Sequence, residues 1–333
     1  MTGVGGCGVG EGIVKSLLLS DGPYRIVAAN MHPAAPVLFR SHAAYLLPPA
    51  SHPEYLDAVK ALCCMQEIDA LIPGSEPELY YLAQNAAAVS GWGVTLVANP
   101  WQVISTCRDK WRTAQFLQRE GLGSIRTSLA PPPDQFLETV GFPVVVKPRS
   151  GHASQHVYVV QEPRELGIVL SYFAIKGIPP IVQECVGQPD QEFTVGAAFS
   201  PAKEPIGAIA MRRRLLGGFS QYVEVEEFPG LCSFGLRVGL RLGASGPLNI
   251  QCRADAGGFR VFEINPRFSG TAPFRAMAGF NEVDLLLRSF LGLGGRPAHP
   301  RVRFGLVGMR GLEEVLLPRE TVDALPRPCP TCC

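Results

Sequence analysis

The stretch Arg260-Val261-Phe262-Glu263-Ile264-Asn265-Pro266-Arg267 decides how this chain is interpreted, because it combines a β-strand pattern with metal-binding side chains. Side chains alternate along a strand, so Glu263 and Asn265 share one face. Gln251 lies on the preceding predicted strand, which a loop containing Gly257-Gly258 joins to this one. Three oxygen-bearing side chains with a single charge suit a magnesium ion that is neutralised mostly by phosphates. The alternative is a pair of solvated strand ends without a ligand.

A second predicted strand supplies the positive charge that phosphate binding needs. Lys147 ends the apolar run Val144-Val145-Val146, and the small polar segment 149–156 follows before another strand begins. The backbone N–H groups of such a strand, loop and strand can fold over phosphates as a flap. An ordinary β-hairpin with a lysine at its rim would have the same pattern, so the segment alone leaves both interpretations open.

Upstream of these motifs, residues 1–98 predict a doubly wound α/β lobe in the order βαβαβ. A glycine turn at 3–10 comes first, and only Met1 and Thr2 precede it, so the first strand is expected to be nearly absent. The other predicted elements are helices at 11–20, 55–64 and 77–90 and strands at 24–29, 68–72 and 94–97.

The glycines of this turn have the spacing of a dinucleotide-binding motif. Gly3, Gly5 and Gly8 match G-x-G-x-x-G, which brings a pyrophosphate to a helix N-terminus in a true site. The next strand, however, ends in Asn30, where an acidic ribose ligand is expected. A structural turn is therefore favoured over a nicotinamide site.

The remainder of the chain predicts a mixed α+β region without an internal repeat. Asn99-Pro100 is typical of an N-cap followed by proline at the first helical position. The elements expected after it are helices at 109–120, 134–140, 164–175 and 282–290 and strands at 144–147, 157–160, 181–184, 193–199, 206–212, 248–253 and 260–265. Arg212-Arg213-Arg214 then follows a strand, as either a solvated charge run or a ligand for an acyl phosphate.

Composition narrows the range of partners. The 333 residues include 47% hydrophobic and 18% charged residues, and the net charge is +1. This balance gives no basic face for nucleic acid or a membrane surface, and no apolar run is long enough to span a membrane. Most of the ten cysteines lie in apolar stretches, as expected of a reduced, cytoplasmic protein.

Five segments together resemble, in order and spacing, the motifs of ATP-grasp enzymes, and the best match is the carbamoyl phosphate synthetase large-chain branch. In that branch a glutamine stands at the first metal position. The segments are Lys147-Pro148, 149–156, 183–187 with 192–195, 249–251 and 263–267, and the resemblance covers about residues 2 to 296. It implies a pre-ATP-grasp lobe at 1–98, a two-lobed ATP-grasp domain at 99–296 and a C-terminal extension at 297–333.

The resemblance also implies a role for each matching residue. Lys110 and Lys147 would contact ATP phosphates, Glu192 would bind the ribose, and Arg267 would steady the transferring phosphoryl group. Gln251, Glu263 and Asn265 would bind Mg²⁺ or Mn²⁺. The flap would contribute Ser150, Gly151, Ala153 and Ser154, and the hinge strand that reads adenine would contribute Gln183, Glu184, Cys185 and Val186. Apart from the resemblance, a ligase that holds an acyl phosphate needs a further cation, so at least one of Arg213 and Arg214 is expected to reach the carboxylate or the γ-phosphate, and Arg214 is the predicted catalytic residue.

Two features depart from the family pattern. The flap has His152, Ala153, Gln155 and His156 where glycines are common, which puts its closure in doubt. The C-terminal tail has Cys329 and Cys332 at the spacing of a zinc motif, but no second pair accompanies them. We therefore expect a disordered tail.

The sequence thus predicts a ligase that activates a small-molecule carboxylate as an acyl phosphate for attack by an amine. Phosphorylation of bicarbonate or carbamate, as in carbamoyl phosphate synthesis, is the second candidate. A nucleotide-binding regulatory module without turnover is the third. A homodimer is compatible with each of these functions.

Overall fold

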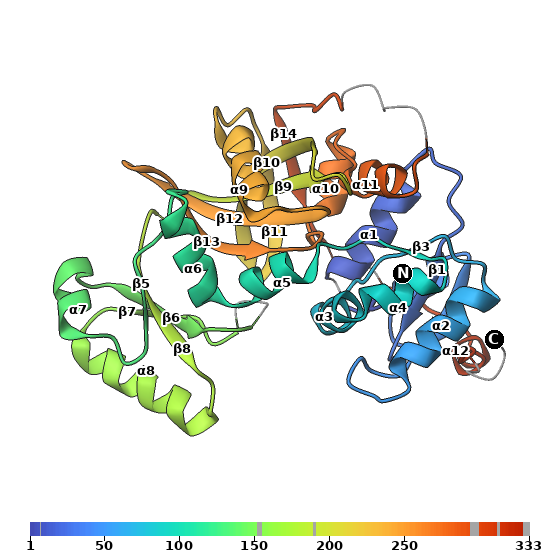
Figure 1. Ribbon diagram of the computed structural model, residues 1–333, viewed down its shortest axis with the longest axis horizontal. Helices are drawn as coiled ribbons and strands as arrows, with labels where there is room; N and C mark the ends of the chain where they lie inside the picture. Colours follow the sequence, from blue (N-terminus) through green and yellow to red (C-terminus); the bar gives the residue numbers. More distant parts are fainter. Residues whose placement is uncertain (7, 152–154, 189–190, 294–299, 312–313, 329–333) are drawn as a thin grey trace.

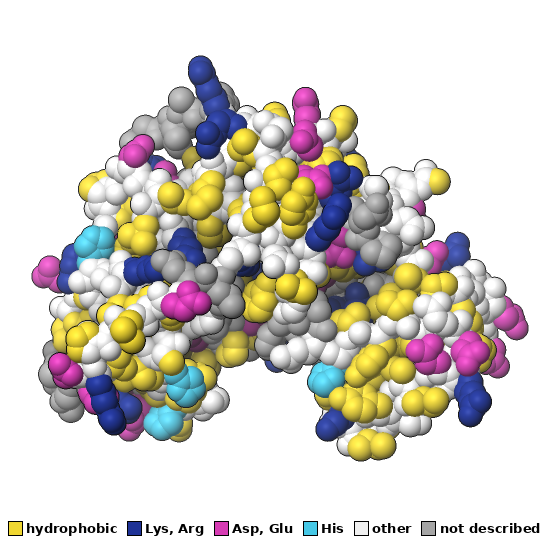
Figure 2. Space-filling model, turned by 180° about the vertical axis from the view of Figure 1, so that it is seen from behind, with side chains coloured by type: hydrophobic (Ala, Val, Ile, Leu, Met, Phe, Trp, Pro, Cys, Tyr) yellow, Lys and Arg dark blue, Asp and Glu magenta, His cyan; other side chains and the backbone are white. Residues whose placement is uncertain are grey.

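The computed structural model describes residues 1–6, 8–151, 155–188, 191–293, 300–311 and 314–328. A large antiparallel sheet lies between an N-terminal α/β lobe and a smaller sheet with two helices (Figure 1). Figure 2 shows a hollow between the N-terminal lobe and the lobe that contains the smaller sheet. Among the described residues, no helix is long and apolar enough to cross a membrane.

The N-terminal lobe has the predicted alternation of strands and helices. Strands β1 (Val27–Asn30) and β2 (Ala43–Leu46) pair in parallel, as do β3 (Ala70–Leu71) and β4 (Thr95–Leu96). Helices α1 (Val9–Leu18) and α2 (Tyr55–Met65) agree with the predicted positions, and a 3₁₀ helix spans Pro36–Arg40. The single helix predicted at 77–90 is wrong: α3 (Glu76–Gln84) and α4 (Ala86–Gly91) meet at Asn85, whose side chain donates to the Tyr81 carbonyl.

Residues 1–4 connect the two small parallel sheets of this lobe. The Ala29 N–H donates to the Met1 carbonyl (2.8 Å), and the Thr2 N–H donates to the Ile72 carbonyl (3.2 Å). A single bridge, Thr2 with Pro73, stands where a full strand would otherwise lie. Gly10 is required beside this segment, because a Cβ there would lie 2.3 Å from the Gly3 carbonyl oxygen.

Helices α5 (Trp101–Arg108) and α6 (Lys110–Arg119) lead from the N-terminal lobe to the smaller sheet. Asn99 was predicted to cap α5, but that prediction is wrong, since Pro100 occupies the cap position. The Asn99 side chain instead donates to the Pro247 carbonyl (2.7 Å) and accepts from the Ser245 N–H (3.1 Å). Asn99 thus ties this linker to the large sheet rather than to its own helix.

The smaller lobe is a four-stranded antiparallel sheet in the order β5-β8-β6-β7. Its core includes Val144, Val146, Val182 and Phe173, all buried. Its elements are β5 (Thr127–Leu129), α7 (Asp134–Val140), β6 (Val144–Pro148), β7 (Tyr158–Val160), α8 (Pro163–Lys176) and β8 (Pro180–Glu184).

The large sheet has the order β13-β12-β9-β10-β11-β14. Its central strand, β9 (Glu192–Phe199), is buried along its whole length. Phe193 and Val195 belong to the core beneath α5, α6 and α9, so Glu192 and Thr194 face the opposite side. The other elements are β10 (Pro205–Leu216), β11 (Phe219–Val225), α9 (Leu231–Leu242), β12 (Pro247–Asp255), β13 (Gly258–Asn265), α10 (Ala272–Met277), α11 (Glu282–Phe290), β14 (Leu306–Met309) and α12 (Arg319–Asp323).

A buried ion pair holds α10 and α11 against this sheet. Arg275 and Glu282 are 0% and 1% exposed, and the Arg275 Nη1 lies 2.7 Å from the Glu282 Oε1. The Arg275 Nη2 also donates to the Thr194 hydroxyl (3.0 Å) and to the Asn249 Oδ1 (2.7 Å). Such a pair is strongly destabilising when only one partner is removed, so it fixes the second face of the sheet.

Candidate active site

The predicted metal-binding side chains meet at the paired ends of β12 and β13. Gln251 is the Cα partner of Glu263, and Asn249 is the Cα partner of Asn265. Gln251 and Glu263 line two cavities, of about 230 Å³ and about 290 Å³, and Asn265 lines the second. We call these the first and the second cavity.

This donor set fits a magnesium ion bound together with phosphates. Among the described residues, no three His, Cys, Asp or Glu side chains form a metal-binding group. A set of two amide oxygens and one carboxylate carries too little charge to hold a divalent cation by itself, and Mg²⁺ commonly takes its remaining ligands from phosphate and water.

Two lysines approach Glu263 from the smaller lobe. Lys147, at the end of β6, is buried, and its Nζ donates to the Phe262 carbonyl (3.2 Å). Burial lowers the pKa of Lys147 to about 7, although Glu263 opposes this shift. The Lys110 Nζ donates to the Gly151 carbonyl (2.9 Å) and lies 4.0 Å from the Glu263 Oε1. Both lysines line the first cavity.

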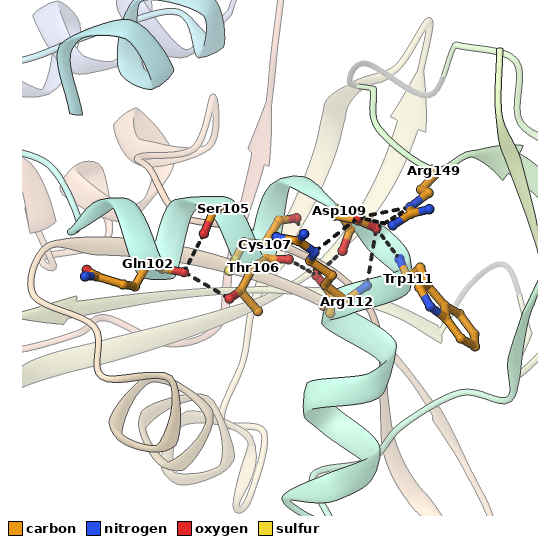
Figure 3. Close-up of polar contacts among 9 residues, drawn as sticks. Gln102, Ser105, Thr106, Cys107, Asp109, Trp111, Arg112 and Arg149 are labelled. Atoms are coloured by element: carbon orange, nitrogen blue, oxygen red, sulfur yellow. Dashed lines mark hydrogen bonds and ion pairs between the residues drawn. The ribbon is translucent and has the colours of Figure 1, made fainter. Parts of the chain in front are cut away.

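The position of Lys110 follows from the cap of α6. Asp109 accepts from the backbone N–H groups of Trp111 and Arg112, as an N-cap does. Its carboxylate also binds the Arg149 guanidinium through two nitrogens, at 2.7 to 3.0 Å (Figure 3). Burial raises the pKa of Asp109, but the hydrogen bonds and charge of Arg149 together with the backbone N–H groups of Arg112 and Trp111 outweigh this effect, and the net shift is downward. Arg149 therefore joins the beginning of the flap to the helix that carries Lys110.

The hinge strand forms another wall of the first cavity. Gln183, Glu184 and Val186 line this cavity, whereas Cys185 is not among its lining residues. The Gln183 side chain donates to the Thr127 hydroxyl (2.9 Å). The Glu184 Oε2 is buried without a hydrogen-bond partner among the described residues. A ligand N–H inside the cavity would satisfy this acceptor.

Glu192, the predicted ribose ligand, is held between two arginines. Its Oε1 accepts from the Arg213 Nη2 (2.9 Å), and its Oε2 accepts from the Arg253 Nη2 (3.1 Å). All three residues line the first cavity. Sequence reasoning missed Arg253, although Arg253 lies two positions beyond Gln251 on the same strand and therefore shares its face.

The structure requires a correction for Arg214. The strand predicted to end at residue 212 continues to Leu216, so Arg213 and Arg214 point to opposite faces. Arg213 is buried and lines both cavities. Arg214 is exposed, and its guanidinium lies 5.3 Å from the centre of the Tyr222 ring. Arg213, which the sequence left as an alternative, is the residue at the site.

Arg267 lines the second cavity together with the glycine turn. The Arg267 Nη2 binds the Glu76 Oε1 (2.8 Å) at the start of α3. Gly3, Gly5 and Gly8 line the same cavity. The glycine turn therefore lines the same cavity as Glu263 and Asn265.

The flap is described only in part. Gly151 and Gln155 line the first cavity, and Ser150 is not among its lining residues. The predicted flap residues Ala153 and Ser154 lie outside the described residues, as do His152 and the cysteines of the tail.

Family comparisons recognise two parts of the chain. The description "ATP-grasp in the biosynthetic pathway with Ter operon" matches residues 181–310, and "PylC-like, N-terminal domain" matches residues 7–97. Residues 181–310 are thus similar to an ATP-grasp family, in agreement with the motifs, and residues 7–97 are similar to a PylC-like N-terminal domain.

Its relatives include the predicted branch. The chain is 22% identical over 251 residues to the carbamoyl phosphate synthase large chain of Helicobacter pylori, covering 68% of this chain and 22% of that protein. It is 29% identical over 122 residues to a probable alpha-L-glutamate ligase of Teredinibacter turnerae, covering 35% and 40%. The chain thus spans about a fifth of the length of the synthase chains that it matches.

Solved structures share the fold. Biotin carboxylase of Campylobacter jejuni superposes with a TM-score of 0.71 at 14% identity, covering 90% of this chain and 72% of that one. N5-carboxyaminoimidazole ribonucleotide synthetase of Thermus thermophilus gives 0.67 at 18% identity, covering 88% and 78%. The predicted fold class is thus confirmed.

Proposed function

We propose that this chain is a ligase that uses ATP and Mg²⁺ to activate a carboxylate as an acyl phosphate, which an amine then attacks. The observation that carries this proposal is the position of Gln251 and Glu263 in the wall shared by two cavities. The same metal-binding residues then face a nucleotide in the first cavity and a second substrate in the second cavity.

In this proposal the first cavity binds ATP. Lys110 and Lys147 neutralise its phosphates, and the hinge from Gln183 to Val186 lines the adenine end. The orphaned acceptor of Glu184 supports this assignment. Gln251, Glu263 and Asn265 would hold Mg²⁺ or Mn²⁺, which supplies charge neutralisation to the phosphates when bound. Glu192 is already bound by two arginines, so we propose that it accepts only one further hydrogen bond, from the ribose.

The acid would bind in the second cavity. Arg213 and Arg267 offer guanidinium groups to its carboxylate. A carboxylate oxygen attacks the γ-phosphorus, the bond to the β,γ-bridging oxygen breaks, and ADP leaves. The amine nitrogen then attacks the acyl carbon, phosphate leaves, and the nitrogen loses a proton. Oriented charge rather than a protein nucleophile would supply the catalysis.

A hydroxylamine trap tests this mechanism. With ATP, Mg²⁺ and the correct acid but no amine, hydroxylamine should yield a hydroxamate and ADP in equal amounts. The protein itself should remain free of phosphate. A phosphohistidine on the chain would contradict the mechanism, and the absence of both products with every acid would favour a binding module without turnover.

Bicarbonate or carbamate is the second candidate substrate. The support for it is the likeness to carbamoyl phosphate synthase large chains, of which this chain spans only part. ADP release that requires bicarbonate and no other acid would establish this alternative.

Three further assignments remain proposals. The domain limits are 1–98, 99–296 and 297–333, although β14 adds a strand to the large sheet from within the last range. The partners are small molecules rather than nucleic acid or a membrane, with a homodimer as the assembly. The location is the cytoplasm.

A further inference from the structure

The wall of the second cavity includes an arginine to which the proposed function gives no role. Arg310 follows the edge strand β14 and lines this cavity. The second cavity shares Arg213 and Glu263 with the first cavity, and it shares Gly8 and Arg310 with a third cavity of about 400 Å³. No described residue lines both the first and the third cavity. Arg310 therefore borders a different part of the second cavity from the part that adjoins the proposed nucleotide site.

Strand pairing places Arg213 and Arg310 on one face of the large sheet. Arg213 is the Cα partner of Val223, which is in turn the Cα partner of Gly308. The Arg310 N–H donates to the Gln221 carbonyl (2.9 Å), so the pairing continues past the end of β14. Side chains two positions apart in a strand share a face, so Arg310 lies on the face of Gly308 and Arg213. Strands β10 and β14, with β11 between them, lie about 10 Å apart.

Two contacts hold the Arg310 guanidinium at this face. It donates to the Gly270 carbonyl, and its carbon Cζ lies 5.3 Å from the centre of the Phe274 ring. The same ring would meet a Cβ added to Gly308 at 2.7 Å, which agrees with the face derived from the strand pairing. A guanidinium presents a planar fork of N–H donors that matches the two oxygens of a carboxylate. Arg310 thus has the position and the donors of a carboxylate-binding group.

The charges that line the second cavity favour a ligand with more than one negative charge. Among the described lining residues, the guanidinium groups belong to Arg213, Arg267 and Arg310, whereas the carboxylates belong only to Glu76 and Glu263. A bound magnesium ion would add further positive charge. A substrate with one carboxylate would place its charge beside Arg213 and Glu263, where it meets the γ-phosphate, and would present no anion to Arg310.

We propose that the acid substrate is compact and has a second anionic group, which Arg310 binds while Arg213 and Arg267 hold the carboxylate that is phosphorylated. This inference rests on the proposed function. The cavity volume of about 290 Å³ suits a short carbon skeleton, and positive charge at two parts of the wall suits its two ends. Arg310 then distinguishes diacids from monocarboxylic acids of the same length.

The test compares acids of equal carbon number in the hydroxylamine trap. Butanoate is paired with succinate, pentanoate with glutarate and hexanoate with adipate, each also as its 2-amino derivative. Hydrogen bonds to charged groups are the stronger ones, so kcat/KM for the preferred diacid should exceed that for its partner by about 10- to 100-fold. The phosphonate analogue of glutarate distinguishes a phosphate from a carboxylate as the second group. No amine substrate is present, so the effect belongs to the acid. Monocarboxylic acids that react as well as every diacid and the phosphonate would overturn the inference.

Substitutions at Arg310 assign the effect to this residue. Arg310→Gln removes the charge and should lower the ratio of kcat/KM for the preferred diacid to that for its partner by about tenfold or more, whereas Arg310→Lys should retain part of the ratio. Arg303→Gln is the matched control, because Arg303 is exposed, donates to the Met277 carbonyl and lines none of the three cavities. Both acids are measured with the same variant, so a partial loss of fold cancels from the ratio. An unchanged ratio in Arg310→Gln would contradict the proposal.

Direct binding separates the failure of this inference from the failure of the proposed function. In calorimetry with MgADP present, glutarate should bind about tenfold or more tightly than pentanoate. Arg310→Gln should remove this difference, and Arg303→Gln should keep it. If no acid yields hydroxamate or ADP but glutarate binds in this way, the ligase function fails and the role of Arg310 stands. If acids react but a second anionic group improves neither binding nor kcat/KM, only this inference fails. If neither reaction nor binding is found, both fail.

Discussion

The two walls of the first cavity differ in how firmly they are held. Glu263 lies on β13, the edge strand of the six-stranded sheet, and pairs with Gln251 on the inner strand β12; Arg275 and Glu282 are buried against the same face of this sheet. Lys147 lies near the end of β6, an inner strand of a separate four-stranded sheet. The contacts that join the walls include Lys147 to the Phe262 carbonyl and Val261 to the Gly123 carbonyl (2.9 Å).

This difference separates two tasks. Metal binding needs donors fixed relative to one another, which neighbouring strands in register provide. Phosphate binding needs a lobe that admits a nucleotide and then closes over it, which a small sheet with few links provides. The predictions below test this separation, from the largest expected effect to the smallest.

The wall that carries Glu263 and Gln251 should be more sensitive to mutation than the wall that carries Lys147. Glu263→Ala removes the single carboxylate of the proposed metal site and should lower kcat by about a thousandfold. The melting temperature should change little, because Glu263 lies at a cavity wall. Asp255→Ala is the control on the same hairpin; it pairs with Arg260, lines neither of the first two cavities and should retain activity within about threefold. Equal activity in the two variants would contradict the metal site.

Because side chains alternate along β10, the same substitution should lower activity at Arg213 and leave it unchanged at Arg214. Arg213→Lys loses the forked hydrogen bonds to Glu192 and should lower kcat/KM by about 10- to 100-fold. Arg214→Lys should be neutral, because Arg214 is exposed and lies beside Tyr222. Lysine keeps the positive charge in both variants. Thermal melting shows whether either variant has lost its fold. A larger effect at Arg214 would mean that β10 is in the wrong register.

Lys147 should make nucleotide binding depend on pH. Its pKa in the free protein is about 7, whereas phosphates favour the charged form. Above pH 7 ATP binding must therefore take up a proton, so affinity should fall by up to about tenfold per pH unit. Calorimetry in buffers of different ionisation enthalpy measures this proton. Lys147→Arg stays charged and should remove the dependence, and a persistent slope in that variant would assign the proton to another group.

The same lowered pKa has the opposite effect on stability. Between pH 7 and the pKa of an unfolded lysine, the unfolded chain binds more protons at this position than the folded chain does. The contribution of Lys147 to the free energy of unfolding therefore increases as pH rises through this window. Lys147→Met should remove that increase.

Removing the ion pair between Arg149 and Asp109 should give the smallest effect. Arg149→Ala breaks a partly exposed ion pair and should cost about 1 kcal/mol or less in the free energy of unfolding. Asp109→Ala also removes the cap of α6 and should cost about 1 kcal/mol more. Urea unfolding compares the two variants. Since the pKa of Asp109 is lowered in the folded chain, its contribution is present at neutral pH and is lost as pH falls through that pKa. Equal costs would show that the cap contributes nothing.

Local patterns in the sequence were enough for the residues whose positions depend only on their own strand or helix. Glu263 and Asn265 share a face because the side-chain period of a strand is two, and the helix predicted at 109–120 is α6, which Asp109 caps through the N–H groups of Trp111 and Arg112. The order of elements was also predictable, since turns and apolar runs mark them. Strands β2, β5, β11 and β14 and helices α9, α10 and α12 were not predicted from the sequence.

Tertiary structure alone decided which of these elements meet. Arg213 faces the cavities because β10 pairs with β9 and β11 beyond the predicted end of the strand. Asn99 binds the large sheet instead of its own helix, since residues 245–247 lie beside it. Gly8 and Gly270, which are 262 positions apart in sequence, both line the second cavity. Spacing along a chain fixes local geometry, whereas a cavity between distant segments depends on packing, which no single segment encodes.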